Sequence, residues 1–200
     1  MKNKLFLGID GSDGSGKTTL IKELKKYYEK ENKKVVHIHF PRYDTEIGEV
    51  IKKVLTNKIK MNPAALQMLY SSDRVNFSTY DFPKLEKEYD IIIADRYTTS
   101  GLVYGQHDGL VLEEIIHNEL RIKKPNLYLI LCADVDVALN RINSRNLEKT
   151  KYEKKEIIKD AIEKYKNLKN IVPDVYLINS NGTIPEMTNQ AIDILEKKDW

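Results

Sequence analysis

The sequence predicts an α/β fold in which a mostly five-stranded parallel sheet is flanked by helices. Three observations predict it: five short apolar runs, segments of helical spacing that alternate with them, and a glycine-rich loop directly behind the first run. Strands of a parallel sheet are buried on both faces, so they read as continuous apolar runs. The runs are KLFLGID, KVVHIHF, DIIIADR, NLYLILCAD and the weaker DVYLINS.

The length and composition indicate one domain, residues 1–200. The 33 Lys and Arg residues nearly balance the 30 Asp and Glu residues, so the charge gives no support for a nucleic-acid partner. The single cysteine, Cys132, lies in a strand-like run, which excludes an internal disulfide and suits a reducing compartment. Because no apolar stretch reaches the length of a membrane span, we expect a cytoplasmic protein without a membrane partner.

The glycine-rich loop at residues 11–18 reads GSDGSGKT and fits the pattern G-x-x-x-x-G-K-[ST]. Glycines let consecutive backbone N–H groups wrap a phosphate, and the helix that follows adds its positive end. We expect this loop to bind a nucleoside triphosphate, with Lys17 on the β- and γ-phosphates and the Thr18 hydroxyl on Mg²⁺. The fold is therefore expected to be a three-layer fold of the P-loop NTPase type. The predicted loop contacts are Gly11, Ser12, Gly14, Ser15, Gly16, Lys17, Thr18 and Thr19.

Two further helix starts are marked in the sequence. Asn62 precedes a proline, and Thr183 stands two residues before another, which is typical of an N-cap followed by proline in the first turn. We expect the helix after Asn62 to run to about Lys87. Residues 140–156 lack an apolar stripe and carry many charges, so we interpret them as a mobile lid, with an ordinary solvated connection as the open alternative.

Arginine is scarce in this chain, with six residues against 27 lysines. The planar guanidinium fork contacts phosphates and base edges in a way that lysine cannot, so the positions of the arginines are informative. Arg96 follows Asp95 at the end of the third apolar run, which is the carboxyl edge where ligands bind in open α/β sheets. We expect Asp95 to be a second acidic partner for Mg²⁺.

Arg74 lies one turn after Tyr70 on the helix that begins at Asn62. Its guanidinium and the tyrosine ring would therefore point into the same space, which suits stacking on and hydrogen bonding to a nucleobase. A structural ion pair beside a core tyrosine is an equally open interpretation. Arg42, with Tyr43 beside it, follows the second run, and Arg141 and Arg145 fall at or in the predicted lid.

Four motifs, taken together and in order, resemble those of the thymidylate kinase family over nearly the whole chain. They are DGSDGSGKTT, FPRYDTEIGEVI, LQMLYSSDRVNF and ADRYTTSGLVYG. The resemblance implies transfer of the γ-phosphate of ATP to dTMP, with ATP and Mg²⁺ as cofactors. It also implies a homodimer built on helix packing.

The resemblance implies roles for residues of the acceptor site. Asp13 would contact the deoxyribose 3′-hydroxyl, and Arg96 would bind the acceptor phosphate with help from Arg42 and Tyr43. Tyr70 would stack on thymine, Arg74 would hydrogen-bond the base, and Tyr104 would help to disfavour a 2′-hydroxyl. The expected substrate contacts are Asp13, Pro41, Arg42, Tyr43, Tyr70, Arg74, Arg96, Tyr97, Ser100 and Tyr104.

On the ATP side, the resemblance places Arg141 on the adenine. Family members carry a catalytic arginine either in the phosphate loop or in the lid, and the loop here has Gly14 instead. This points to Arg145 in the lid, with Lys149 and Lys151 as substitutes. The expected catalytic residues are Lys17, Arg96, Arg145 and Asp13.

The sequence departs from the family at two positions and leaves other functions open. Tyr70 stands where Phe is more common, and Asp10 where Glu is, so base selectivity could differ. A deoxynucleoside kinase or a kinase for another pyrimidine monophosphate is the alternative, and a non-catalytic nucleotide-binding protein is a weaker one. A nucleotide switch is disfavoured, because NKIK at Asn57 lacks the aspartate of a base-reading Asn-Lys-x-Asp. No general base is expected, because a monophosphate acceptor is already ionised at neutral pH.

Overall fold

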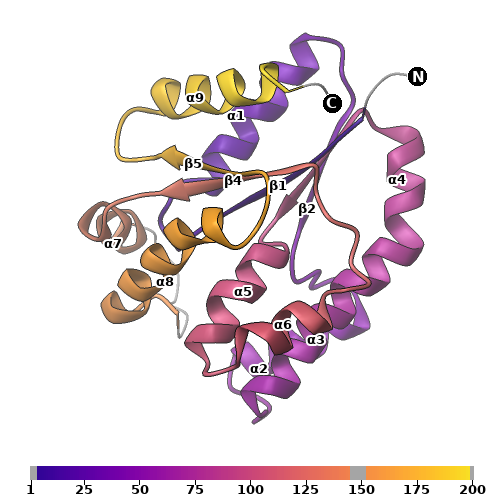
Figure 1. Ribbon diagram of the computed structural model, residues 1–200, viewed down its shortest axis with the longest axis vertical. Coiled ribbons are helices and arrows are strands. Elements are labelled where there is room, and N and C mark those ends of the chain that lie inside the picture. The colour runs from indigo at the N-terminus through magenta and orange to yellow at the C-terminus, as the bar shows by residue number, and fades with distance from the viewer. Residues whose placement is uncertain (1–3, 145–151, 199–200) are drawn as a thin grey trace.

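A computed structural model describes residues 4–144 and 152–198 of the chain. Its centre is a five-stranded sheet in the order β2-β3-β1-β4-β5, in which every neighbouring pair is parallel (Figure 1). The five strands match the five apolar runs, so the predicted α/β fold with a parallel sheet is confirmed. The strands are β1 (Leu5–Gly11), β2 (Val35–His39), β3 (Ile91–Asp95), β4 (Leu127–Cys132) and β5 (Val175–Asn179).

Helices cover both faces of this sheet (Figure 1). The first half of the chain supplies α1 (Lys17–Lys30), α2 (Glu46–Leu55), α3 (Pro63–Asn76), a π-helical turn (Phe77–Asp81), α4 (Phe82–Glu88) and α5 (Thr98–His107). The second half supplies α6 (Leu112–Asn118), α7 (Val135–Asn143), α8 (Lys155–Asn167), a 3-10 turn (Leu168–Asn170) and α9 (Ile184–Glu196).

Alternate residues of β1 point into two different cores. Leu5, Leu7 and Ile9 pack under α1 and α9, which lie side by side on one face. Phe6 points to the other face, where it joins an aromatic cluster beneath α3 and α4. Burial on both faces explains why this strand reads as an unbroken apolar run.

The helical segment that begins after Asn62 consists of two α-helices joined by a π-helical turn. Asn62 caps it by accepting a hydrogen bond from Ala64 N, as predicted. Helical structure continues to Glu88, close to the expected end, but it passes through the π-helical turn at Phe77–Asp81. The Thr183 cap is also confirmed, because its side chain accepts from Glu186 N and forms a capping box.

The predicted lid at 140–156 does not form one segment. Its first residues belong to the last turn of α7, because Ala138 and Ile142 give that helix a buried apolar stripe. Its last two residues open α8. Residues 145–151, which include Arg145, Lys149 and Lys151, lie outside the described residues. Within the part of the chain that is described, no helix is long and apolar enough to cross a membrane.

Candidate active site

The glycine-rich loop links the carboxyl end of β1 to the start of α1, as the sequence predicts. Gly14 and Gly16 take φ values of 75° and 98°, which side-chain-bearing residues rarely adopt. A Cβ on Gly14 would also lie 2.3 Å from the Ala138 carbonyl oxygen. The hydroxyls of Ser12 and Ser15 are buried there without a hydrogen-bond partner among the described residues. The loop therefore presents donors that suit an anion.

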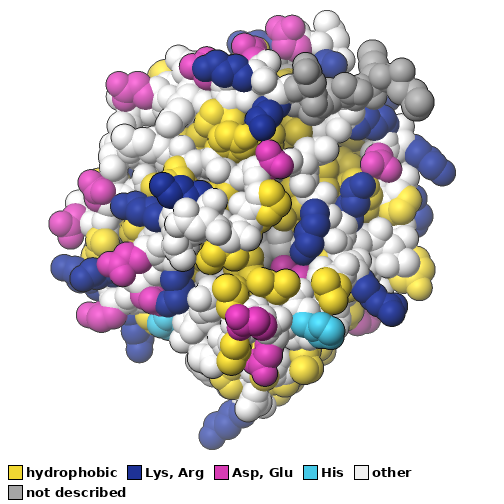
Figure 2. Space-filling model, in the orientation of Figure 1, with side chains coloured by type: hydrophobic (Ala, Val, Ile, Leu, Met, Phe, Trp, Pro, Cys, Tyr) yellow, Lys and Arg dark blue, Asp and Glu magenta, His cyan; other side chains and the backbone are white. Residues whose placement is uncertain are grey.

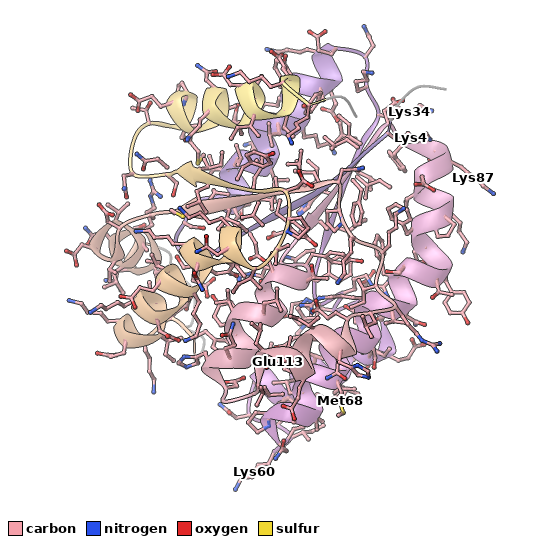
Figure 3. The ribbon with its side chains drawn as sticks, viewed as in Figure 1. Lys4, Lys34, Lys60, Met68, Lys87 and Glu113 are labelled. Atoms are coloured by element: carbon pink, nitrogen blue, oxygen red, sulfur yellow. The ribbon has the colours of Figure 1, made fainter. Side chains whose placement is uncertain are left out.

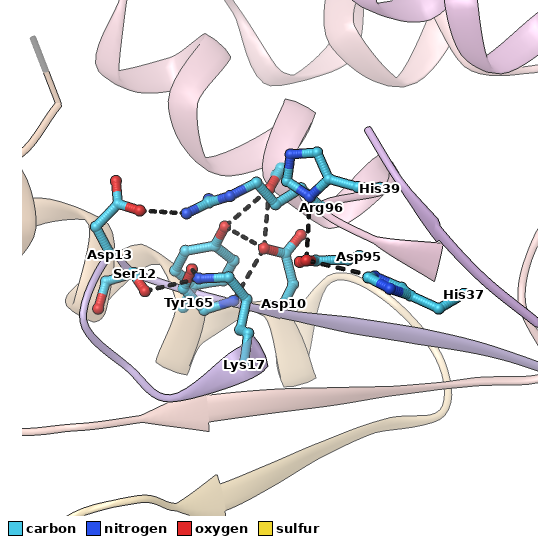
Figure 4. A network of polar contacts seen from close by, with 11 residues as sticks. Asp10, Ser12, Asp13, Lys17, His37, His39, Asp95, Arg96 and Tyr165 are labelled. Atoms are coloured by element: carbon cyan, nitrogen blue, oxygen red, sulfur yellow. Dashed lines mark hydrogen bonds and ion pairs between the residues drawn. The ribbon is translucent and has the colours of Figure 1, made fainter. Parts of the chain in front are cut away.

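Lys17 is folded back over this loop. Its ammonium group donates to the carbonyl oxygens of Gly11 and Ser12, both at 2.8 Å (Figure 4). Burial and the nearby charge of Arg96 lower the pKa of Lys17 from 10.5 to about 8. A bound phosphate would supply the negative charge that favours the protonated form.

One pocket, of about 310 Å³, opens on the α9 side of the loop. Arg141 reaches it from α7 and donates to the carbonyl oxygens of Ser180, at 2.8 Å, and Gly14, at 3.4 Å. Thr19 lines the same pocket beside Gly14 and Gly16. Arg141 is thus held next to the phosphate loop, and its contact to adenine stays a prediction.

A second pocket, of about 150 Å³, lies on the other side of the loop, among β2, β3, α3 and α5. Most of the predicted substrate residues line it, although they come from four separate parts of the chain. They are Asp13, Pro41, Tyr43, Tyr70, Arg74, Arg96, Ser100 and Tyr104. We call this cavity the acceptor pocket.

At one end of the acceptor pocket, Arg96 forms an ion pair with Asp13 (Figure 4). Arg96 directly follows β3 and has a φ of 61°, a left-handed conformation that is uncommon outside glycine. Such strain is concentrated at functional positions, because the surrounding structure must hold it. The backbone there turns the guanidinium toward the phosphate loop.

At the other end lie Tyr70 and Arg74 of α3. Arg74 pairs with Glu119 at 2.8 Å, and both side chains are almost fully buried. Arg74 therefore takes part in a structural ion pair and lines the acceptor pocket as well. The two interpretations of this residue that the sequence left open are compatible.

Two predicted substrate residues are not brought to the acceptor pocket. Tyr97 is fully buried in the aromatic cluster, and its hydroxyl lies 3.1 Å from Ser78 Oγ. Arg42 turns away and binds Asp73, with Nε to Oδ1 at 2.8 Å, and Asp81. Neither residue lines the acceptor pocket: Tyr97 packs in the core, and Arg42 ties the β2–α2 loop to α3 and the π-helical turn, so their contacts to substrate stay predictions.

Asp95 ends β3 beside the phosphate loop. Its Oδ2 lies 3.1 Å from His39 Nδ1 and 3.7 Å from His37 Nε2, while its Oδ1 is buried without a partner among the described residues (Figure 4). Burial opposes its ionisation, yet the two histidines and the charges of Lys17 and Arg96 hold the pKa of Asp95 well below its usual range. A buried, ionised oxygen with no partner is the kind of atom that a cation would satisfy.

The Asp10 carboxylate joins three elements behind the loop. It accepts hydrogen bonds from the hydroxyls of Thr99 and Ser100 on α5, both at 2.8 Å, and from Tyr165 on α8 at 2.7 Å. It also accepts from Gly11 N at 2.9 Å. Asp10, which the sequence marked only as a departure from Glu, thus connects the phosphate loop to the wall of the acceptor pocket.

Sequence reasoning missed four polar residues of this site. Gln67, His39 and Tyr152 line the acceptor pocket, and Tyr152 packs on Tyr104 with ring centroids 4.9 Å apart. Glu119 orients Arg74 from the end of α6. Only Gln67 carried a usable signal, because it lies three residues before Tyr70 and seven before Arg74 and so shares their helix face.

A phosphate-binding loop between two pockets, with a strained arginine facing it, defines a P-loop phosphotransferase. The family model described as thymidylate kinase matches residues 9–192 of the chain. The chain belongs to the thymidylate kinase family.

Similar proteins align with almost the whole chain. A thymidylate kinase of Caldicellulosiruptor saccharolyticus is 31% identical, over 99% of this chain and 100% of that protein. A probable thymidylate kinase of Thermococcus kodakarensis is also 31% identical, over 96% of this chain and 97% of its own length. The structure of a thymidylate kinase from Candida albicans matches with a TM-score of 0.77 at 24% identity, over 98% of this chain and 92% of that one. This structural match supports the fold.

Proposed function

We infer that the chain is a thymidylate kinase, which transfers the γ-phosphate of ATP to dTMP and yields dTDP and ADP. The observation that carries this function is the position of the phosphate loop between two pockets. Gly14 and Gly16 line the pocket beside Arg141, and Asp13 of the same loop lines the acceptor pocket beside Arg96. Two phosphorylated ligands held in these pockets would meet at the loop, which is the arrangement that in-line transfer needs.

On the ATP side, the backbone N–H groups of the loop, the hydroxyls of Ser12 and Ser15, and Lys17 would bind the phosphates. Arg141 would lie against the adenine. Lys17 would exchange its two carbonyl contacts for phosphate oxygens. Arg145 lies outside the described residues, so its role on the transferred phosphate stays a prediction, as does closure of a lid.

On the acceptor side, Arg96 would bind the dTMP phosphate. Asp13, which pairs with Arg96, would orient it and contact the 3′-hydroxyl, and Tyr43 would flank the phosphate. Tyr70 would stack on the base, Arg74 would donate to it, and Tyr104 would lie at the sugar. Because the phosphate is already ionised, these residues position the nucleophile and neutralise charge, and no base removes a proton.

The residues beside the loop fit Mg²⁺. Asp95 offers a buried oxygen without a partner among the described residues, and Thr18 is an exposed residue at the start of α1. Among the described residues, no group of three His, Cys, Asp or Glu side chains could hold a metal ion alone. Mg²⁺ typically uses one or two protein oxygens with substrate phosphates and water. When bound, the ion would neutralise charge on the transferred phosphoryl group.

We propose that the protein forms a homodimer through α3 and α6. Met68 on α3, Ile116 on α6 and Leu120 just after it are 56%, 43% and 68% exposed. Figure 2 shows hydrophobic side chains over the lower end of the molecule, where α3 and α6 lie in Figure 1. Figure 3 shows Met68 pointing away from the sheet. Light scattering on the parent and on Leu120→Asp tests this: a dimer that the substitution dissociates is expected, and a monomeric parent would contradict it.

A coupled assay with ATP and Mg²⁺ tests the function across acceptors. We expect dTMP to be the best acceptor among the nucleoside monophosphates, and thymidine to be inactive, because Asp13, the acidic side chain among the described residues of the pocket lining, is paired with Arg96. Preferred use of thymidine would instead support a deoxynucleoside kinase. A higher rate with dCMP or UMP would support a kinase for another pyrimidine monophosphate.

A further inference from the structure

A buried glutamine, Gln67, lies in the wall of the acceptor pocket and has no role in the function described so far. Its side chain is 3% exposed. It precedes Tyr70 by three residues and Arg74 by seven on α3, so all three side chains share one face of the helix. A buried side-chain amide normally has its hydrogen bonds satisfied, so a poorly bonded amide in a pocket calls for an explanation.

The amide of Gln67 is poorly satisfied within the described part of the chain. Its nitrogen donates to the Gly101 carbonyl oxygen at 3.5 Å, a long contact, and its Oε1 has no hydrogen-bond partner among the described residues. A primary amide offers two donors on nitrogen and an acceptor on oxygen. The contact to Gly101 turns the nitrogen toward α5 and leaves Oε1 as a free acceptor in the pocket wall.

Arg74 supplies a free donor in the same wall. Its Nη1 is held by Glu119, while its Nε is buried without a partner among the described residues. Gly101 gives these groups room, because a Cβ there would lie 2.8 Å from Arg74 Nη1 and 2.7 Å from Glu119 Oε1. The wall therefore presents one acceptor, from Gln67, and one donor, from Arg74, next to the ring of Tyr70.

This pair matches the edge of a 4-keto pyrimidine. Thymine carries the acceptor O4 beside the donor N3–H, whereas cytosine carries a 4-amino donor beside an N3 acceptor. We propose that Gln67 Oε1 accepts the hydrogen bond from N3–H of thymine while Arg74 donates to O4, so that Gln67 is a specificity residue of this kinase. The proposal rests on the proposed function, in which dTMP fills the acceptor pocket with its base against Tyr70.

Two other polar groups of the pocket wall are already paired. The Ser100 hydroxyl donates to Asp10 and lies 3.1 Å from the Tyr165 hydroxyl. The Asp13 carboxylate is paired with Arg96 at the phosphate end. Gln67 shares the helix face of Tyr70 and Arg74, which places its neutral acceptor where the base would lie.

The test compares Gln67→Leu and Gln67→Glu with the parent, using kcat/KM for dTMP, for dCMP and for N3-methyl-dTMP, which lacks the N3–H. In the leucine variant we expect kcat/KM for dTMP to fall roughly ten- to a hundredfold, because the N3–H is then buried unpaired. The dCMP value should fall much less, so the preference for dTMP narrows. The parent should disfavour the N3-methyl analogue, and the leucine variant should discriminate against it much less.

Gln67→Glu keeps the shape, and its carboxylate form keeps the acceptor and removes both donors. We expect it to retain dTMP activity and to reject dCMP more strongly than the parent does. This variant also serves if Gln67→Leu fails to fold, and a thermal melt checks both. Gln106→Leu is the matched control, because Gln106 lies on α5 outside the pocket lining and donates to the Leu102 carbonyl at 2.7 Å; its preferences should equal those of the parent.

The outcomes separate the two proposals. If the parent phosphorylates dTMP and both Gln67 variants keep its dTMP to dCMP ratio, the base-reading role is overturned and the kinase function stands. If the parent does not phosphorylate dTMP, the proposed function itself fails, and the role of Gln67 fails with it.

Discussion

Nη1 of Arg74 lies 2.8 Å from Oε1 of Glu119, and their side chains are only 4% and 3% exposed. Lys124 approaches the second Glu119 oxygen at 3.6 Å from a solvent-exposed position. The pair joins α3 to the end of α6, across 45 residues of sequence. The orientation of the arginine that faces the nucleobase is thus set by a carboxylate from a different part of the chain.

Glu119→Gln is expected to be tolerated at neutral pH. Burial raises the pKa of Glu119 above its ordinary value of 4.5, although the charges of Arg74 and Lys124 oppose this. Because the pKa of this carboxyl is raised on folding, the folded state binds more protons than the unfolded state. The free energy of unfolding therefore falls as the pH rises from about 4.5 through the raised pKa. The glutamine variant lacks this loss, and its free energy of unfolding relative to the parent should increase with pH over that window. Urea denaturation at pH 5 and pH 7 measures it.

Glu119→Ala should behave differently, because it removes the hydrogen-bond partner of Arg74 and opens a cavity. Breaking a buried pair in this way costs about 3–5 kcal/mol. An alanine variant as stable as the glutamine variant would show that the contact to Arg74 contributes little.

Arg96→Ala should impair use of dTMP far more than use of ATP. Removing the buried charged partner of a ligand phosphate costs about 2–5 kcal/mol, which corresponds to a fall in kcat/KM for dTMP of roughly thirty- to several thousandfold. Steady-state kinetics with each substrate varied in turn checks this. Arg121→Ala, on the exposed turn after α6, is the control and should leave both values unchanged. Full activity of Arg96→Ala would remove Arg96 from the acceptor site.

Lys17→Met should abolish ATP binding while leaving dTMP binding intact. The lysine lies at the loop, and its ammonium is the charge best placed for the β- and γ-phosphates. Since burial already disfavours its charged form, we expect the free energy of unfolding to stay within about 1 kcal/mol of the parent at pH 7. Calorimetric titration measures the affinity for ATP and for dTMP, and urea denaturation measures the free energy of unfolding. Loss of dTMP binding would mean that the loop shapes both pockets.

Tyr97→Phe tests whether that residue acts in the core alone or also at the substrate. The change removes only the contact between the Tyr97 hydroxyl and Ser78 Oγ, so it should cost about 1 kcal/mol of stability. The KM for dTMP should not change, because the ring belongs to the core. A several-fold higher KM for dTMP at unchanged kcat would restore Tyr97 to the substrate site.

The strands and the phosphate loop were predictable because their signals are local. An apolar run such as DIIIADR reports burial on both faces directly, and the loop pattern needs particular residues at fixed spacing. The π-helical turn at Phe77–Asp81 was not predictable, because its residues continue a helical pattern.

The directions of side chains near the motifs depend on tertiary partners. Arg42 was itself an expected substrate contact, yet it pairs with Asp73, 31 residues further on, and does not line the acceptor pocket. Glu119 gave no signal, because a lone carboxylate near a helix end is ordinarily solvated. Gln67 could have been found by extending the face of Tyr70 and Arg74 one turn toward the N-terminus.

The four hydrogen bonds that converge on the Asp10 carboxylate have a consequence for the energetics of transfer. Three of them come from side chains far along the chain, on α5 and α8, and the fourth comes from the backbone of the phosphate loop itself. These bonds hold the donor and acceptor sites at a fixed distance. The entropy of fixing that distance is therefore lost when the protein folds, and not again each time substrates bind. The enzyme is preorganised for a near-attack geometry before either nucleotide arrives.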